Sequence, residues 1–317
     1  MNEIPLVSTI IPTYNRAHII GEAVDSVLSQ TYPNVEVIVV DDGSTDNTPE
    51  ILRQYGDRIR VISQRNAGPA VARNRGIKAS TGEVIAFLDS DDIWLPAKLE
   101  RQIALMNQAG DKVPCCLCNI LMKWRDVEFA SFDRAWLRPD ISEGIWMNVD
   151  EVLATRFVLF NQGAAVRREV LSKLGGFDES LRFMEDYDLP LRLALEGPWA
   201  FIGEPLVVWR ETRVSWYKQS QREALLQKTC TVQVFERLSE TVHKRAGEPR
   251  LKQCVAGELK RARREVLAAR LGEMPFPAPL VASSLRAVER LRRAAYRRSP
   301  SFPRMKVVES SAFCAGL

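Results

Sequence analysis

Histidine is nearly absent from this chain of 317 residues, which contains only His18 and His243. Two histidines leave little scope for a zinc-hydrolase cluster or for a Ser/His/Asp triad, because both need imidazole groups. Asp and Glu together number 40 and are the remaining candidates for a catalytic acid, a catalytic base or a metal ligand. We therefore expect the chemistry of this protein to depend on carboxylates.

Cysteine is also scarce, with six residues in the chain. Cys115, Cys116 and Cys118 lie too close together to form half of a paired CxxC zinc site. Six cysteines in a chain of this length do not indicate a disulfide framework either. These residues are expected to be buried thiols.

Long hydrophobic runs are missing as well. The longest uncharged apolar stretches, such as residues 113–122 and 276–285, have about ten residues, whereas a membrane-spanning helix needs about 20. The first five residues carry no basic leader, so a secretory signal is not expected. These features predict a cytoplasmic protein without a transmembrane anchor.

The net charge of +4 hides an uneven distribution along the chain. Residues 1–243 contain 27 Lys and Arg against 34 Asp and Glu, whereas residues 244–306 contain 17 against 5. This asymmetry indicates that the two regions do different jobs.

The first hundred residues contain short continuous apolar runs and a segment in which apolar residues recur at helical spacing. Residues 7–12, 34–40, 59–63 and 83–88 are short apolar runs typical of buried strands. Between the first two runs, apolar residues recur every three or four positions over residues 19–28, which places them on one face of a helix. Strand, helix and strand in this order predict a parallel βαβ arrangement and an α/β fold.

Acidic residues follow two of these predicted strands. Asp41-Asp42 ends the second run, and Asp89-Ser90-Asp91-Asp92 follows the fourth. Parallel strands bring their carboxyl ends to one edge of the sheet, where ligands of open α/β sheets bind. Crowded carboxylates repel one another, and Mg²⁺ or Mn²⁺ offsets this repulsion while also accepting phosphate oxygens. A loop of solvated acids is the alternative.

A feature suited to anions precedes the fourth strand. Residues 66–76 contain a glycine turn, with Pro69 at the predicted first position of a helix. A helix N-terminus with Arg65 and Arg73 nearby suits a diphosphate. On these residues alone, a capped surface helix with solvated arginines is an equal alternative.

From Val7 to about Ser215, the chain resembles the inverting glycosyltransferases of family 2, which have the GT-A fold. The shared motifs are VSTIIPTYN (7–15), SQTYP (29–33), VDDGSTD (40–46), NAGPAVARN (66–74), FLDSDD (87–92), GGFD (175–178) and EDYDL (185–189). In this order and spacing they are highly specific for the fold and for a sugar-nucleotide site.

The resemblance implies the fold class and the domain organisation. We expect an α/β, Rossmann-like GT-A domain over residues 1–218, with a mixed, mostly parallel sheet flanked by helices. Residues 1–112 would form its nucleotide-binding half and residues 113–218 its acceptor half. A basic, helical and partly flexible C-terminal extension would cover residues 219–317.

For the donor, the resemblance implies that Pro12 and Tyr14 line the base pocket and that Asp42 accepts a hydrogen bond from the base. Tyr14 could otherwise be a plain aromatic residue at a strand end. Asp89 would face the ribose, and Arg73 would lie near the diphosphate.

The acidic stretch after the fourth strand looks like the family's DXD motif. Asp91 would bind a divalent metal, Mn²⁺ or Mg²⁺, that bridges the diphosphate and neutralises charge on the departing nucleotide. Asp92 is expected to cap the following turn instead.

Glu185 and Asp186 match the family's acidic pair. The resemblance implies that Asp186 is the general base that takes the proton from the acceptor hydroxyl, with Glu185 beside it. The pKa of Asp186 is expected to lie near or moderately above that of an ordinary Asp. The alternative is that both residues simply stabilise the N-terminus of a helix.

Two departures from the family pattern bear on the metal and the product. Many relatives carry Arg-x-His after the acidic pair, but residues 209–213 contain no His, which puts the third metal ligand in doubt. Arg210 or Arg213 could close over the diphosphate instead. The Gln-x-x-Arg-Trp signature of processive members is absent, which favours transfer of a single sugar.

Seven aromatic residues lie between the two acidic motifs, in the region that forms much of the acceptor side in relatives. They are Trp124, Phe129, Phe132, Trp136, Trp146, Phe157 and Phe160. Some of these rings would stack on a sugar and most are expected to be core, but the sequence gives no basis for choosing among them.

Basic and apolar residues alternate in the tail, over residues 260–264 and 286–298. This pattern is compatible with an amphipathic helix at an anionic membrane surface, where it would bring the enzyme to a lipid-linked acceptor. An Arg-rich solvated helix or a poorly ordered tail is the alternative. Nucleic acid is a weaker candidate partner, because few aromatics are interleaved with the basic residues.

The sequence thus predicts transfer of one sugar, with inversion, from a nucleotide-sugar donor to a glycan or lipid-linked acceptor in cell-surface polysaccharide or lipopolysaccharide assembly. UDP-sugars are the expected donors. One alternative is a nucleotidyltransferase that makes a nucleotide sugar, although residues 12–16 lack its Gly-rich loop and Lys. Another is a catalytically silent scaffold that uses the basic tail.

Overall fold

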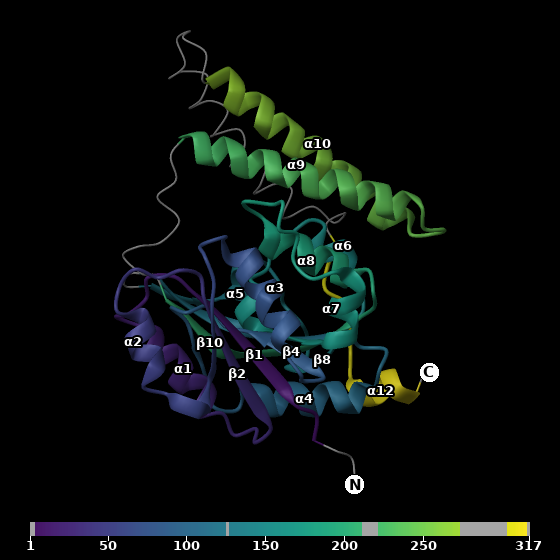
Figure 1. Ribbon diagram of the computed structural model, residues 1–317. Coiled ribbons are helices and arrows are strands. Elements are labelled where there is room, and N and C mark those ends of the chain that lie inside the picture. The colour runs from purple at the N-terminus through teal and green to yellow at the C-terminus, as the bar shows by residue number, and fades with distance from the viewer. Residues whose placement is uncertain (1–3, 125–126, 211–220, 273–302, 316–317) are drawn as a thin grey trace. The chain divides into compact units, whose positions relative to one another are not determined.

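The structure is a computed structural model that describes residues 4–124, 127–210, 221–272 and 303–315 (Figure 1). Its strands are β1 Val7–Thr13, β2 Val35–Asp41, β3 Arg60–Ser63, β4 Val84–Phe87, β5 Ile93–Trp94, β6 Cys115–Trp124, β7 Val127–Ala130, β8 Glu143–Trp146, β9 Ala164–Arg167, β10 Trp199–Arg210 and β11 Val307–Val308. The helices are α1 Ile20–Leu28, α2 Thr48–Arg53, α3 Pro69–Ala79, α4 Lys98–Ala109, α5 Ser131–Arg134, α6 Val149–Leu153, α7 Arg168–Leu174, α8 Glu185–Ala194, α9 Gln221–His243, α10 Pro249–Gly272 and α12 Ser310–Ala315. Short 3₁₀ turns occur at Gly56–Arg58 and Asn161–Gly163.

One mixed sheet carries the fold, in the order β11-β8-β10-β6-β9-β4-β1-β2-β3, with β5 on β10 and β7 on β6. Strands β3, β2, β1 and β4 are parallel, as the alternating pattern of the first hundred residues predicts. Beyond them, β9 lies antiparallel between β4 and β6, whereas β6 and β10 are parallel. The predicted α/β fold class is confirmed.

Buried apolar side chains explain why these segments become strands and helices. Every residue of β4 is buried, as expected for a strand covered on both faces. On α1, Ile20, Ala23, Val24 and Val27 form one buried face at helical spacing. Helix α3 packs on β1 and β2, and α4 packs on β6 and β10.

Contacts between Cα atoms divide the chain into two units. Unit 1 comprises residues 1–149, 156–215 and 305–317, and unit 2 comprises residues 150–155 and 216–304. In unit 2, α9 and α10 pack against each other as a helical hairpin. No helix of the described residues is long and apolar enough to cross a membrane.

The sequence predicts that the last described segment, residues 303–315, belongs to the C-terminal extension. Its residues from 305 onward instead belong to unit 1. Val307 and Val308 pair with the edge strand β8, and Phe313 packs against the core. The Cys314 thiol donates a hydrogen bond to the Gln108 carbonyl (2.9 Å), and Figure 1 shows α12 beside α4. An unpaired sheet edge and an apolar ring thus hold these residues on the domain. Residues 286–298, part of the predicted amphipathic segment, lie outside the described residues.

Candidate functional site

The site lies at one edge of the sheet, where three parallel strands end. Strand β1 pairs in parallel with β2 on one side and with β4 on the other. The chain therefore leaves all three strands at the same edge. Tyr14 follows β1, Asp42 follows β2, and Asp89 lies two residues after β4.

The turn after β1 leaves the Tyr14 side chain 43% exposed. Asn15 next to it has a φ of 53°, in the left-handed region that Asn tolerates. Its side-chain oxygen accepts a hydrogen bond from the Thr45 backbone N–H (2.7 Å), and its own N–H donates to the Ser44 hydroxyl (2.9 Å). These bonds join the loops after β1 and β2 and hold a half-buried Pro12 and an exposed aromatic ring at the sheet edge.

Asp42 organises the turn in front of α3. One of its carboxylate oxygens accepts hydrogen bonds from the Gln64 amide (2.7 Å) and the Ala67 N–H (2.8 Å), and the other from the Gly68 N–H (2.8 Å). Gly68 has a φ of 95°, which favours glycine at this position. The residue that the sequence assigns to the base therefore also shapes the N-terminus of α3.

Arg73 joins the two acidic motifs. Its guanidinium donates to Asp89 (2.8 Å) and to Glu185 (3.3 Å) and lies 5.3 Å from the centroid of the Phe177 ring. Burial alone would lower the pKa of Arg73, but the surrounding carboxylates outweigh it and raise this pKa. Arg73 is thus a buried cation, whereas Arg65 is exposed.

The acidic pair opens α8. Glu185 is buried against Arg73, while Asp186 is half-buried. Burial, together with the charges of Glu185 and Asp89, raises the pKa of Asp186 to about 7, although Arg73 acts in the opposite direction. A carboxyl group with a pKa near neutrality can take up and release a proton at physiological pH.

The GGFD turn before α8 is fixed by two neighbouring side chains. The Asn74 side chain exchanges two hydrogen bonds with the backbone of Phe177, both 2.8 Å long. Arg192 pairs with Asp188 (2.6 Å) and donates to the carbonyl oxygens of Leu174 (2.9 Å) and Gly176 (2.8 Å). Asp188 therefore helps to hold this turn through Arg192.

The DXD stretch presents carboxylates of two kinds. The side chains of Asp89 and Asp91 are 30% and 24% exposed, and Asp91 lies 3.6 Å from the Arg16 guanidinium. Asp92 is buried and accepts hydrogen bonds from the Gln162 amide (2.9 Å) and from the Arg210 backbone N–H (3.1 Å). Asp92 therefore joins two distant segments instead of capping the next turn.

Arg210, one of the two arginines expected to close over the diphosphate, is tied to the same loop. Its Nε donates to the Asp91 carbonyl oxygen (2.8 Å), and its Nη1 contacts the Glu22 carboxylate (2.5 Å). The alternative candidate, Arg213, lies outside the described residues.

Three buried guanidinium nitrogens near these acids have no hydrogen-bond partner within the described part of the chain. They are Nε of Arg16, Nε of Arg73 and Nη2 of Arg210. Buried donors without partners are costly, and an anionic ligand would satisfy them. Positive groups therefore accompany the acids at this edge, as a metal-assisted diphosphate site requires.

The donor set fits a metal ion that is shared with a diphosphate. No group of three or more His, Cys, Asp or Glu residues in the described ranges is arranged to hold a metal on its own. Asp89 and Asp91 nevertheless offer partly exposed, hard oxygen ligands two residues apart. Mg²⁺ and related ions are commonly bound by one or two carboxylates completed by phosphate oxygens and water.

Sequence reasoning missed Arg16, Asn74 and Gln162. Arg16 follows the motif at residues 7–15 and Asn74 ends the motif at residues 66–74, so the local sequence could have indicated both. Gln162 lies about 70 residues from Asp92, and no local pattern links the two; only the way β9 inserts between β4 and β6 brings them together.

Comparisons with known proteins show which family and fold this chain resembles. Residues 8–126 match the sequence profile described as "Glycosyl transferase family 2". An uncharacterised glycosyltransferase of Rickettsia typhi is 37% identical over 188 residues, which cover 58% of this chain and 57% of the relative. The putative teichuronic acid biosynthesis glycosyltransferase TuaG of Bacillus subtilis is 49% identical over 106 residues, which cover 32% of this chain and 42% of TuaG. The chain thus spans little more than half the length of the first of these relatives.

Solved structures share the fold. S. aureus TarS 1–349 in complex with UDP-GlcNAc has a TM-score of 0.63 at 20% identity, covering 86% of this chain and 74% of that chain. The mannosyltransferase PcManGT from Pyrobaculum calidifontis, in complex with GDP-Man and Mn²⁺, has a TM-score of 0.56 at 23% identity, covering 90% and 81%. Residues 8–126 thus match glycosyltransferase family 2, the sequence relatives are named glycosyltransferases, and the solved structures share the GT-A fold of this chain.

Proposed function

We propose that this chain transfers a single sugar from a nucleotide-sugar donor, with inversion, to a hydroxyl of a glycan or lipid-linked acceptor. The observation that carries the proposal is the meeting of Asp89, Arg73, Glu185 and Asp186 at the sheet edge where β1, β2 and β4 end. Arg73 contacts both acidic motifs, so the diphosphate side and the base side of one reaction centre are adjacent.

The donor is proposed to be a UDP-sugar. Pro12 and Tyr14 would line the base pocket, with Asp42 facing the base and Asp89 the ribose. The unpartnered guanidinium nitrogens described above suit the diphosphate. TarS in complex with UDP-GlcNAc supports a uridine nucleotide, because the same fold binds it there.

Asp91 would hold a divalent metal, Mn²⁺ or Mg²⁺, and PcManGT with bound Mn²⁺ supports this choice. When bound, the ion would neutralise charge on the departing nucleoside diphosphate. Arg210, bound to the Asp91 carbonyl, would keep the loop that carries this carboxylate in place.

Asp186 would act as the general base. An inverting transfer needs a carboxylate opposite the leaving group, so that the acceptor hydroxyl loses its proton as it attacks the anomeric carbon. A pKa of about 7 makes Asp186 a stronger base than an ordinary carboxylate, while a substantial fraction remains ionised at neutral pH. Glu185, held by Arg73, maintains this raised pKa through its charge.

The biological role is proposed to be cell-surface polysaccharide or lipopolysaccharide assembly in the cytoplasm. TuaG, named for teichuronic acid biosynthesis, supports a polysaccharide role. A nucleotidyltransferase is less favoured, because the relatives are named glycosyltransferases. A catalytically silent scaffold is less favoured, because it would not need a carboxyl group such as Asp186, whose pKa is raised beside the charged groups Arg73 and Asp89.

To test transfer and its stereochemistry, the protein is incubated with Mn²⁺, one donor (UDP-Glc, UDP-GlcNAc, UDP-Gal or GDP-Man) and one acceptor (the methyl β-glycoside of glucose, galactose, mannose or N-acetylglucosamine). The anomeric proton of the newly formed glycoside is followed by NMR. An α-linked donor is expected to give a β-configured product, and Asp186→Asn is expected to slow its formation by roughly 10²–10⁴-fold. An α-configured product would contradict inversion, and unchanged turnover by Asp186→Asn would remove Asp186 as the base.

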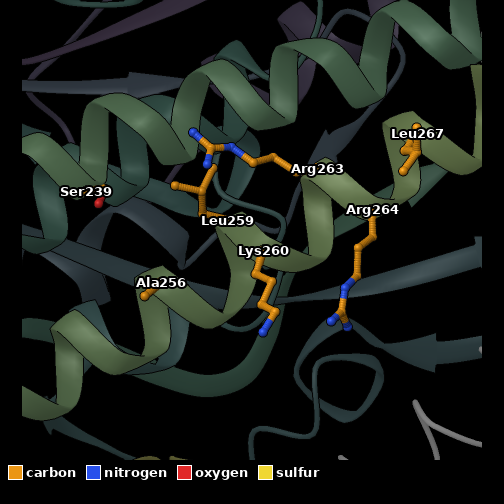
Figure 2. Close-up of a pocket in the computed structure, with 7 residues that line it drawn as sticks. All are labelled: Ser239, Ala256, Leu259, Lys260, Arg263, Arg264 and Leu267. Carbon is orange, nitrogen blue, oxygen red and sulfur yellow. The ribbon is translucent and has the colours of Figure 1, made fainter.

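A peripheral contact with the inner face of the cell membrane completes the proposal. In the α9–α10 hairpin, a groove of about 360 Å³ is lined by Ser239 of α9 and by Ala256, Leu259, Lys260, Arg263, Arg264 and Leu267 of α10. Figure 2 shows Lys260 and Arg264 extending to the same side of the helix, while Arg263 reaches toward α9, where it pairs with Glu236 (2.7 Å). Two exposed cations one turn apart, beside an exposed Leu267, suit an anionic lipid surface.

Sedimentation with vesicles tests this contact. Binding to vesicles that contain phosphatidylglycerol, but not to pure phosphatidylcholine, is expected, and Lys260→Glu with Arg264→Glu should weaken it, at roughly 1 kcal/mol per basic residue removed. The matched control reverses Arg75 and Lys78, exposed residues of α3. If both double variants lose the same amount of vesicle binding, only the net charge matters, and the α10 surface is no longer part of the proposal.

A further inference from the structure

Three aromatic side chains are exposed in the described part of the chain: Tyr14, Trp136 and Phe157. Tyr14 belongs to the donor edge. Trp136 (46% exposed) and Phe157 (40% exposed) lie in the half between the two acidic motifs, where other rings such as Phe132, Trp146 and Phe160 are buried. Exposure therefore separates two rings from the core aromatics, which the sequence could not do.

The two loops that carry these rings are joined by a side chain. The Arg156 guanidinium donates to the carbonyl oxygen of Trp136 (2.9 Å) and to that of Ala135 (3.4 Å). Since Arg156 precedes Phe157 in the chain, this bond brings the two aromatic residues onto neighbouring loops. The apolar exposure is confined to the rings, because Ala135 and Leu137 are buried.

Trp136 is held in an unfavourable backbone conformation. Its φ of 57° lies in the left-handed region, which is uncommon for a bulky residue, directly after α5. Helices that end in this way usually place Gly there, because glycine avoids the steric cost. A Trp at this position keeps a large ring at the surface where Gly would fold more easily, and this points to a role outside folding. The Arg138 guanidinium lies over one face of this ring, 5.6 Å from its centroid, so a ligand would pack on the other face.

Phe157 connects this aromatic surface to the reaction centre. Its ring meets that of Tyr187 edge-to-face, with the centroids 5.4 Å apart and the planes at 66°. Tyr187 is buried in the first turn of α8 and follows Asp186 directly. The exposed ring of Phe157 therefore adjoins the helix turn that carries the proposed base.

We propose that Trp136 and Phe157 form a platform on which the apolar C–H face of the acceptor sugar packs, so that one of its hydroxyls reaches Asp186. This inference rests on the proposed function and identifies the acceptor as a sugar ring at this position. Sugar rings present hydroxyls at the rim and C–H groups on their faces, and these C–H groups match the negative face of an aromatic ring. Two rings are too small a surface for docking a protein, which buries far more area.

Binding of simple glycosides tests the platform. The wild-type protein, saturated with UDP and Mn²⁺, is titrated with the methyl β-glycosides of glucose, galactose, mannose and N-acetylglucosamine, and binding is followed by saturation-transfer NMR and calorimetry. At least one glycoside is expected to bind, with saturation strongest on the C–H protons of one ring face. Phe157→Leu and Trp136→Leu should each weaken this binding by roughly tenfold, whereas Phe157→Tyr should retain it.

Affinity for UDP serves as the internal control. UDP binding should stay unchanged in both Phe157 variants, and the melting temperature should stay unchanged in Phe157→Tyr, which keeps the ring contact with Tyr187. Tyr14→Ala should weaken UDP binding. If wild-type protein binds UDP but none of the glycosides, or if both Leu variants bind them like the wild type, the platform is refuted while the donor site stands. If the wild-type protein does not bind UDP, the proposed function is refuted, and the platform is refuted with it.

Discussion

Glu185 and Asp186 are adjacent carboxyl groups whose surroundings assign them different tasks. Glu185 is buried and paired with Arg73, which fixes the position of its side chain. Asp186 is desolvated and lies next to Glu185 and to Asp89, which raises its pKa to about 7. Arg73 acts in the opposite direction and prevents a larger shift. Arg73 thus pairs with Asp89 and also limits the rise in the pKa of Asp186, the proposed base.

The pH dependence of sugar transfer follows from this arrangement. Asp186 must be ionised to accept a proton, so kcat/KM should rise with pH through an apparent pKa near 7 and level off above it. Asp186→Asn should lower the rate by roughly 10²–10⁴-fold. Donor consumption measured between pH 5.5 and 8.5 checks this, and a rate that stays constant over that range would contradict it.

The same shift predicts a stability effect. A carboxyl group whose pKa is higher in the folded than in the unfolded protein destabilises the fold progressively as pH rises from about 4 to 7. Asp186→Asn removes this cost, so it should raise the melting temperature more at pH 8 than at pH 5, by roughly 2–4 °C for each kcal/mol regained. Thermal unfolding of both proteins at the two pH values is the measurement. If Asp186→Asn is less stable than the wild type at pH 8, ionised Asp186 does not destabilise the fold.

Gln162 is predicted to position the acidic loop. Replacing it by Met removes the donor to Oδ2 of the buried Asp92 and leaves only the Arg210 backbone N–H on Oδ1, at a cost of about 1–3 kcal/mol in the free energy of unfolding. It should also weaken binding of UDP in the presence of Mn²⁺, because Asp91 precedes Asp92. Gln102→Met is the matched control, since Gln102 holds the same 3₁₀ turn through Gly163 (2.8 Å) but is not bonded to Asp92. Equal binding losses in both variants would indicate a general structural effect.

At the scale of elements, α3 is the part that connects the site. Its N-terminus is shaped by Asp42, its middle carries Arg73, and Asn74 holds the turn before α8. These contacts require α3 to lie close to β1. Gly76 allows this approach, because a Cβ atom built there would come within 2.4 Å of Ile10 Cγ2.

Gly76→Ala is therefore expected to destabilise the domain by about 1–3 kcal/mol, as overpacking in a tight core does. Gly257→Ala on α10 is the matched control, because no atom lies within 4 Å of its added Cβ and Ala favours helices. That variant should be neutral or slightly stabilising. Chemical denaturation of both variants provides the comparison, and a neutral Gly76→Ala would mean that α3 is not held tightly against β1.

At the scale of the whole molecule, local pattern predicted the parts of the site that follow parallel strands. Asp42, Asp89 and Asp91 could be placed at one edge because β1, β2 and β4 are apolar runs with acids at their ends. Tertiary contacts between distant segments left no such pattern. The pairing of Asp92 with Gln162 depends on how β9 inserts between β4 and β6, which the local sequence does not encode.

The same limit explains the other differences. Val307 and Val308 form too short a run to be recognised as a strand, yet the open edge of β8 captures them. The burial of Arg73 depends on acids from two distant motifs, so the sequence alone could not distinguish it from a solvated arginine. The exposure of Trp136 and Phe157 likewise follows only from the packed fold.

The central claim is that the edge formed by β1, β2 and β4 binds a nucleoside diphosphate together with a metal. Isothermal titration of the purified protein with UDP and with GDP, each with and without Mn²⁺, tests it most directly, on the wild type and on Asp91→Ala. UDP is expected to bind in a Mn²⁺-dependent manner, and UDP binding by Asp91→Ala should no longer depend on Mn²⁺. Absence of binding by both nucleotides, or Mn²⁺-dependent binding that persists in Asp91→Ala, would contradict this claim.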